Sequence, residues 1–246
     1  QEFRQLSHAV NGMLDRLAHS FDLQRQFAGN AAHELRTPLA LMQTKLELFC
    51  EEHADADAET MQMAAFQMEQ LDRLSALVRT LLSMSNLQSV SRTDEIPLAP
   101  LAEEILTDLA PFAQEKQVTL RQNCEEVSMV GSDALIYRLL FNLIENAIKY
   151  NKPGGTVFVS VKQADENVIL EVAATGSGIP EDCMEHIFEP FFRVDKSRSR
   201  QMGGVGLGLA LVHEIAVLHG GSVRAEPGNK VGTVFIVTLP AEDDHC

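Results

Sequence analysis

Apolar residues in the first third of the chain recur at alternating intervals of four and three residues. This spacing is a heptad seam and predicts a helix with one apolar side, formed by Ala28, Ala32, Leu35, Leu39, Met42, Leu46 and Phe49. The small, acidic stretch 51–59 predicts a turn. A second helix follows, with an apolar side made of Met61, Ala64, Met68, Leu71, Val78 and Leu82. Residues 1–20 read as an amphipathic helix that leads into this hairpin.

A hairpin of two helices has too little core to stand alone. Pairing with a second copy would bury both seams in a four-helix bundle. The pattern therefore predicts a homodimer formed through the helical hairpin.

The pattern changes after the polar stretch 89–97, which ends in proline and predicts a domain boundary. Helices are predicted at 98–116, 132–150 and 207–219, and strands at 117–122, 127–130, 156–162, 167–173, 222–226 and 232–239. A glycine-rich irregular region spans 175–206. Strands grouped on one side of a few helices predict an α/β sandwich with a mixed sheet. The expected segments are a signalling helix (1–20), the hairpin (21–90), a linker (91–97), the α/β domain (98–240) and an acidic tail (241–246).

Composition narrows the functional classes. The chain has 246 residues, 45% of them hydrophobic, and a net charge of −15, which argues against a nucleic-acid partner. Its four cysteines have no metal-ligand spacing and predict reduced thiols. No apolar run approaches the ~18 residues that a membrane span needs. Because the chain begins with Gln1, we expect a soluble fragment of a protein whose membrane segments would precede it.

The run from Phe27 to Leu39 contains the strongest chemical signal. His33 has a carboxylate beside it (Glu34) and a hydroxyl four residues on (Thr37), and all three lie off the apolar seam. Residues four apart share a helical face, so His33 and Thr37 point the same way. Pro38 removes a backbone hydrogen bond at a cost of roughly 3 kcal/mol. A proline beside an exposed histidine favours a site over a plain coil.

Three further motifs lie in the α/β domain. Asn142, Asn146 and Lys149 line one helical face, where amide oxygens can ligate a hard cation and an ammonium can meet phosphate; a solvated polar face is the alternative. Two glycines, Gly176 and Gly178, follow a strand and let the backbone approach a flat ligand. Further glycines open the last helix, where backbone amides favour an anion: Gly203, Gly204, Gly206 and Gly208.

The stretch before these last glycines is locally basic. It carries four positive charges against one negative charge between Arg193 and Arg200. A mobile lid over polyphosphate and a solvated loop both fit this pattern. A Rossmann site does not fit, because no βαβ unit follows the glycines.

Taken together and in this order, the motifs resemble the N, G1, F and G2 boxes of the Bergerat ATP-binding fold, with residues 188–192 as the F box. Combined with the run around His33, the chain resembles the cytoplasmic catalytic core of a bacterial sensor histidine kinase from about Phe21 to Pro240. Residues 1–20 are similar to the last helix of a HAMP module. The implied fold is an antiparallel helical hairpin in a dimeric four-helix bundle, followed by a Bergerat α/β sandwich. The implied location is the cytoplasmic side of the bacterial inner membrane.

The resemblance also implies residue roles. His33 would accept the γ-phosphoryl group of ATP, Glu34 would take the proton of the other ring nitrogen, and Thr37 would orient the water that dephosphorylates a partner response regulator. Asn146, assisted by Asn142, would ligate Mg²⁺. The implied nucleotide-binding set, with phosphate held by Lys149 and Arg193 and the base or ribose against Tyr150, is Asn142, Asn146, Lys149, Tyr150, Ala174, Gly176, Gly178, Ile179, Arg193, Lys196, Gly204, Gly206, Leu207, Gly208 and Thr233.

One position departs from the family pattern. Ala174 stands where the G1 box carries an aspartate that accepts a hydrogen bond from the adenine amino group. The loss of such a bond is worth roughly 1.5–3 kcal/mol, or about tenfold to hundredfold in affinity. The other boxes are intact, which favours an engineered substitution over a naturally degraded kinase. The leading hypothesis is a kinase with weakened ATP binding. The alternatives are a nucleotide-binding-deficient scaffold or phosphatase-only pseudokinase, and an ATPase of the topoisomerase or chaperone kind, which would lack His33.

Overall fold

The computed structural model describes residues 29, 31, 34–53, 56–87, 90–194, 206–228 and 232–241, without the side chains of residues 79–86. The chain divides into two compact units, residues 1–87 and residues 88–246. Within the described ranges, no helix combines the length and the apolar character that crossing a membrane requires.

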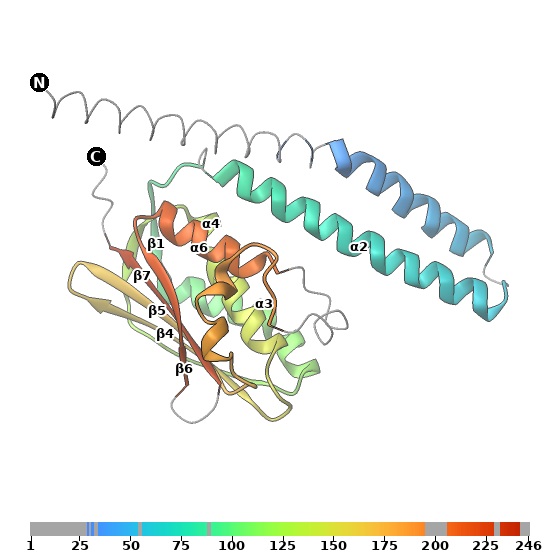
Figure 1. Ribbon diagram of the computed structural model, residues 1–246. Helices are drawn as coiled ribbons and strands as arrows, with labels where there is room; N and C mark the ends of the chain where they lie inside the picture. The colour runs from blue at the N-terminus through green and yellow to red at the C-terminus, as the bar shows by residue number, and fades with distance from the viewer. Residues whose placement is uncertain are drawn as a thin grey trace, which may run out of the picture. The chain divides into compact units, whose positions relative to one another are not determined.

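The first unit is a helical hairpin. A helix over 34–52 continues through Pro38, and α2 (Ala58–Asn86) runs back beside it (Figure 1). Leu39 and Val78 are buried between the helices, with Leu71 packed against them. The Gln43 side-chain amide donates a hydrogen bond to the Asp72 carboxylate and links the two helices. The predicted hairpin is therefore confirmed.

The turn of the hairpin is shorter than the predicted range 51–59. Asp57 caps α2: its side chain accepts hydrogen bonds from the backbone N–H of Thr60 at 2.9 Å and from the Thr60 hydroxyl at 2.7 Å. These bonds stabilise the carboxylate and lower the pKa of Asp57. Because Asp57 satisfies free amide groups at the helix start, α2 begins at Ala58, inside the range expected to be a turn.

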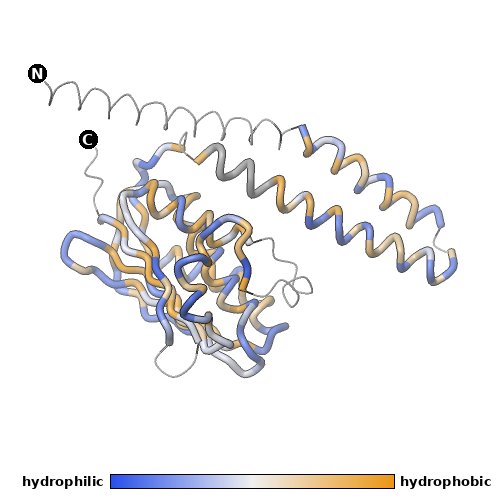
Figure 2. Tube along the Cα trace, in the orientation of Figure 1, coloured by the Kyte–Doolittle hydropathy of each residue, from blue (hydrophilic) through white to orange (hydrophobic). Residues whose placement is uncertain are grey.

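Only part of the apolar seam is covered within one chain. Leu39 is buried and Leu46 and Phe49 are half-buried, whereas Leu35 and Met42 are 49% and 56% exposed. Figure 2 shows apolar and polar residues mixed along both helices. A single partner helix can cover only one side of the seam, which leaves its other side open. Ala28, Ala32 and the side chain of Leu82 lie outside the described residues.

The second unit is a two-layer α/β sandwich. Its elements are β1 (Asp94–Pro97), α3 (Leu98–Glu115), β2 (Thr119–Cys124), β3 (Ser128–Gly131), α4 (Asp133–Lys149), β4 (Thr156–Ala164), β5 (Asn167–Ala174), the 3₁₀ turns η2 (Glu181–Cys183) and η3 (His186–Phe188), α6 (Gly208–Leu218), β6 (Ser222–Pro227) and β7 (Thr233–Pro240). The main sheet has the order β2-β4-β5-β7-β6. β2 and β4 are parallel and the other pairs are antiparallel, which confirms the predicted mixed sheet.

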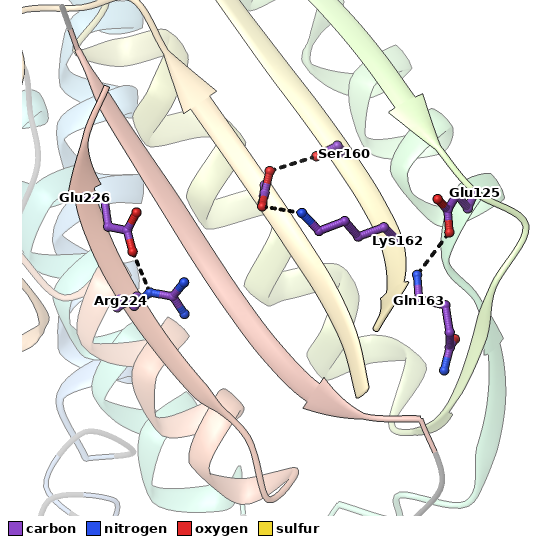
Figure 3. A network of polar contacts seen from close by, with 7 residues as sticks. Glu125, Ser160, Lys162, Gln163, Arg224 and Glu226 are labelled. Carbon is purple, nitrogen blue, oxygen red and sulfur yellow. Dashed lines mark hydrogen bonds and ion pairs between the residues drawn. The ribbon is translucent and has the colours of Figure 1, made fainter. Parts of the chain in front are cut away.

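Helices α3, α4 and α6 cover one face of this sheet (Figure 1). Alternation along β4 and β5 turns Val159, Val161, Leu170 and Val172 toward the helices, where all four are buried. The other face is polar in part. There Glu171 accepts hydrogen bonds from Ser160 and Lys162, and Arg224 pairs with Glu226 at 2.8 Å (Figure 3).

The expected linker 91–97 needs a correction. Its last four residues form β1, which pairs with β3 in a small antiparallel sheet. Ile96 lies opposite Met129, and both side chains are almost fully buried. A single apolar residue in a polar stretch gives no readable alternation, so the sequence pattern missed this strand.

Two side-chain contacts fix the start and the middle of α4. The backbone N–H of Ser132 donates to Nε2 of buried His219 at 3.1 Å, while Nδ1 of His219 donates to the carbonyl of Ile215 at 2.8 Å. This pattern requires the neutral imidazole with its proton on Nδ1. The Tyr137 hydroxyl donates to Asp108 on α3 at 2.7 Å, and this bond raises the pKa of Tyr137 to about 12.

Candidate functional site

The polar stripe predicted on α4 is present and faces the start of α6. Asn142, Asn146 and Lys149 are all half-buried. The side-chain amide of Asn142 donates to the carbonyl of Arg138 at 2.7 Å, which fixes its orientation. A Cβ added at Gly208 would lie 2.9 Å from Oδ1 of Asn142, so the first residue of α6 must be small for the helices to approach this closely.

Two cationic side chains converge at the C-terminal end of this stripe. Partial burial lowers the pKa of Lys149; Glu145 opposes this shift, and the nearby positive charge of Arg193 adds to it. Partial burial raises the pKa of Tyr150, and the positive charge of Arg193 opposes this rise. The ammonium of Lys149 lies 5.8 Å from the centre of the Tyr150 ring. Lys149, Tyr150 and Arg193 therefore form one cluster.

The guanidinium of Arg193 has an unused donor. Its Nη2 atom is buried and has no hydrogen-bond partner within the described part of the chain. A buried donor without a partner costs free energy, and more so when it is charged. Two cations held together in a chain of net charge −15 suit an anion with several oxygens.

The end of β5 closes the other side of this cluster. Ala174 continues the helix-facing positions of β5, and it pairs with Val157 and Thr233. A Cβ added at Gly176 would lie 2.5 Å from the carbonyl oxygen of Tyr150, so this turn packs directly against the end of α4. The structure thereby places Gly176 against Tyr150, two residues after the pair that Ala174 forms with Thr233.

The sequence pattern missed one residue of this wall. A Cβ at Gly232 would overlap the carbonyl oxygen of Ala174, and Gly232 also lies against Gly178. Only glycine permits that approach. The sequence offered one signal for Gly232, its position immediately before β7 and next to Thr233. Its contact with Ala174 joins segments that are distant in the chain, and such a contact leaves no pattern in the local sequence. Ile179 follows Gly178 and is half-buried.

The loop between η3 and α6 is anchored where its described ends meet. The backbone N–H of Phe191 donates to the carbonyl of Gly206 at 2.8 Å. Gly206 has φ +78°, and a Cβ there would lie 2.7 Å from the carbonyl oxygen of Phe192. Both observations require glycine at this position. Leu207 is buried behind it, whereas Lys196 and Gly204 lie outside the described residues.

In the first unit, the structure places two of the three predicted catalytic positions. Glu34 and Thr37 are exposed on the helix over 34–52, consistent with their place off the seam. His33 lies outside the described residues.

The side chains at this site could hold Mg²⁺ only together with a bound molecule that supplies further oxygen ligands. Across the described residues, no group of three His, Cys, Asp or Glu side chains could hold a metal ion. The amide oxygens of Asn142 and Asn146 are neutral ligands of the kind that Mg²⁺ accepts beside phosphate oxygens. The arrangement therefore fits a polyphosphate with an accompanying divalent cation.

Comparisons with known protein families agree with this arrangement. Residues 23–90 match the family described as His Kinase A (phospho-acceptor) domain. Residues 131–243 match the family described as histidine kinase-, DNA gyrase B-, and HSP90-like ATPase. The two matches correspond to the hairpin and to most of the α/β sandwich.

The chain is also similar to individual proteins. It is 35% identical to the sensor protein CutS of Streptomyces coelicolor over 242 residues, which cover 97% of this chain and 58% of CutS. It is 36% identical to the sensor histidine kinase RppB of Synechocystis over 226 residues, which cover 90% of this chain and 50% of RppB. The chain thus spans about half the length of these relatives. The solved structure of the mycobacterial sensor histidine kinase MprB is 25% identical, with a TM-score of 0.55, and covers 61% of this chain and 99% of its own.

Proposed function

Because the chain contains the phospho-acceptor and ATPase domains of the sensor histidine kinase family and forms the catalytic core of such a kinase, we propose that it transfers the γ-phosphoryl group of ATP to His33. One imidazole nitrogen of His33 attacks the γ-phosphorus, an N–P bond forms, and the bond from that phosphorus to the β–γ bridging oxygen breaks. ADP leaves with the bonding electrons. Glu34, beside His33 in the sequence, accepts the proton of the other ring nitrogen and fixes the reactive tautomer.

The cluster around Arg193 carries this proposal. Phosphoryl transfer depends on positioning and on neutralising charge that develops on the phosphate oxygens. The unused, buried Nη2 of Arg193 and the neighbouring Lys149 supply such donors. We assign them, with Lys196, to the phosphates of ATP.

The remaining assignments follow the same geometry. Tyr150 lies against the adenine or ribose, beside the wall formed by Ala174, Gly176, Gly178, Ile179 and Thr233. Gly204, Gly206, Leu207 and Gly208 allow the following loop and helix to approach the phosphates. Asn146, with Asn142, would hold Mg²⁺, which neutralises phosphate charge when it is bound.

Two later steps complete the proposed cycle. The phosphoryl group of His33 passes to an aspartate in the receiver domain of a response regulator. Thr37 orients the water that removes the phosphoryl group from that regulator. We further propose that the chain works on the cytoplasmic side of a bacterial membrane, as its place in the sensor histidine kinase family implies.

A scaffold without kinase activity is the second candidate. Ala174 favours it, because a methyl group at this wall cannot accept a hydrogen bond from adenine. In that case, the chain would bind a regulator and act as a phosphatase or as a docking module without turning over ATP.

Phosphorylation with radiolabelled ATP separates the two candidates. We expect the chain to take up label that is lost in acid and retained in base, as a phosphoramidate is. The variant His33→Gln should take up none, and His53→Gln is the matched control, since His53 is exposed and directly follows the helix over 34–52. No label in the unaltered chain and none in Ala174→Asp would favour the scaffold.

We also propose that the active form is a homodimer through the hairpin. Leu41, Met42 and Leu74 are 62%, 56% and 47% exposed in one chain. They line a groove of about 670 Å³ together with Leu46, Phe49 and Leu71. A second hairpin would bury this surface and complete a four-helix bundle.

Sedimentation tests the dimer. Met42→Asp places a charge in the groove and should shift the chain from dimer to monomer. Glu47→Asp changes an exposed position of the same helix and should leave the dimer intact. A monomeric unaltered chain would contradict this assignment.

A further inference from the structure

A third guanidinium lies on the polar stripe of α4. Arg138 is one helical turn before Asn142, and its carbonyl oxygen accepts the hydrogen bond that orients the Asn142 side chain. Positions 138, 142, 146 and 149 fall within an arc of about 80° around the helix axis, because each residue advances by about 100°. Arg138 is therefore at the N-terminal end of the row that ends at Lys149.

The surroundings of Arg138 supply no counter-charge. The side chain is half-buried, and burial alone lowers its pKa. Within the described residues, its guanidinium makes no ion pair. Arg224, by contrast, pairs with Glu226 on the far face of the sheet. Partial burial of an unpaired guanidinium on a binding face is costly unless a ligand supplies an anion.

The charged and polar side chains follow one another along α4 in a definite order. Lys149 and Arg193 meet at its C-terminal end, next to Tyr150 and the wall that faces the base. Asn146 and Asn142 follow, and Arg138 comes last, about 16 Å along the helix axis from Lys149. A nucleotide with its base at the Tyr150 end directs its terminal phosphate toward the Arg138 end.

We propose that Arg138 binds the terminal phosphate of the nucleoside triphosphate and thereby distinguishes the triphosphate from the diphosphate. This inference rests on the proposed function, since it concerns the same site. A guanidinium offers paired N–H donors that match phosphate oxygens, and it holds its charge at any physiological pH. Arg138 would position the γ-phosphate beyond the reach of Lys149 and Arg193.

Calorimetric titration of the full chain with Mg-ATP and with Mg-ADP tests the inference. The variant Arg138→Gln should bind ATP about tenfold more weakly, as expected for the loss of a charge-assisted bond, and should bind ADP as the unaltered chain does. Arg224→Gln is the matched control, because it removes the same charge on the opposite face of the sheet (Figure 3) and should change neither affinity. Equal weakening for both nucleotides, or no change for either, would overturn the assignment.

A second variant guards against misfolding. Arg138→Lys keeps the charge and much of the packing but loses the paired donors. It should also weaken ATP binding selectively, with an unchanged thermal melting temperature. If Arg138→Lys changed the ATP and ADP affinities by the same factor, the role of Arg138 would be refuted and the proposed function would stand. Failure of the unaltered chain to bind either nucleotide would instead refute the proposed function, and the inference with it.

Discussion

Restoring a carboxylate at position 174 should recover nucleotide affinity. Ala174 ends β5 on its helix-facing side, opposite Val157 and Thr233, and it is half-buried. Residues directly opposite on neighbouring strands have Cβ atoms about 5 Å apart, so the Thr233 hydroxyl is within reach of the carboxylate that Ala174→Asp introduces. That carboxylate would be held facing the base and would remain partly hydrated.

The gain follows from a single charge-assisted hydrogen bond. Such a bond is worth about 1.5–3 kcal/mol, so Ala174→Asp should tighten ATP binding by about tenfold to hundredfold. Selectivity for ATP over GTP should rise too, because the carboxylate accepts from the adenine amino group and repels the guanine carbonyl oxygen. Calorimetry with both nucleotides measures the two effects.

The neighbouring residue provides the control. Ala173 lies on the opposite face of β5, across from Phe158 and Val234, so Ala173→Asp adds the same charge away from the site. Its ATP affinity should stay at the level of the unaltered chain. Equal gains in both variants, or no gain at position 174, would refute the placement of the base against Ala174.

Three further perturbations test separate parts of the account. Thr37→Ala should slow dephosphorylation of the regulator by about a hundredfold while sparing phosphorylation of the kinase, and equal loss of both rates would contradict the assigned role. His219→Ala leaves a buried backbone amide without its acceptor and should lower the free energy of unfolding of the second unit by about 1–3 kcal/mol in a thermal melt, whereas exposed His213→Ala should change it little. Because the bond to Asp108 raises the pKa of Tyr137, it stabilises the fold below pH 10 and this contribution is lost as the pH rises toward about 12. An ultraviolet titration should show one tyrosine that ionises near pH 12 and that ionises earlier in Asp108→Asn, and an unchanged titration would refute the contact.

The sequence predicted the features that have a local signature. The apolar periodicity of α4 and the alternation of β4 and β5 identified these elements, because each buries one face against the core. Gly206 and Gly208 were identified because they lie at the start of a helix, where backbone amides favour an anion. The structure adds the physical reasons: a left-handed backbone requires glycine at position 206, and the close approach to the Asn142 side chain requires a small residue at position 208.

Features that depend on contacts between distant segments escaped the sequence pattern. β1 is too short to show alternation, and it forms because Ile96 pairs with Met129 on β3. Gly232 is required by the carbonyl of Ala174, which is far away in the chain. Arg138 is an ordinary helix residue in the sequence, and only its partial burial without a partner among the described residues singles it out.

Mapping the phosphorylated residue tests the central claim most directly. After incubation with Mg-ATP and digestion at alkaline pH, mass spectrometry of the unaltered chain should find one added phosphoryl group on the peptide that contains His33, with fragment ions assigning it to the imidazole. A phosphoryl group on a serine, a threonine or another histidine would contradict the account. So would an unmodified His33 in both the unaltered chain and Ala174→Asp.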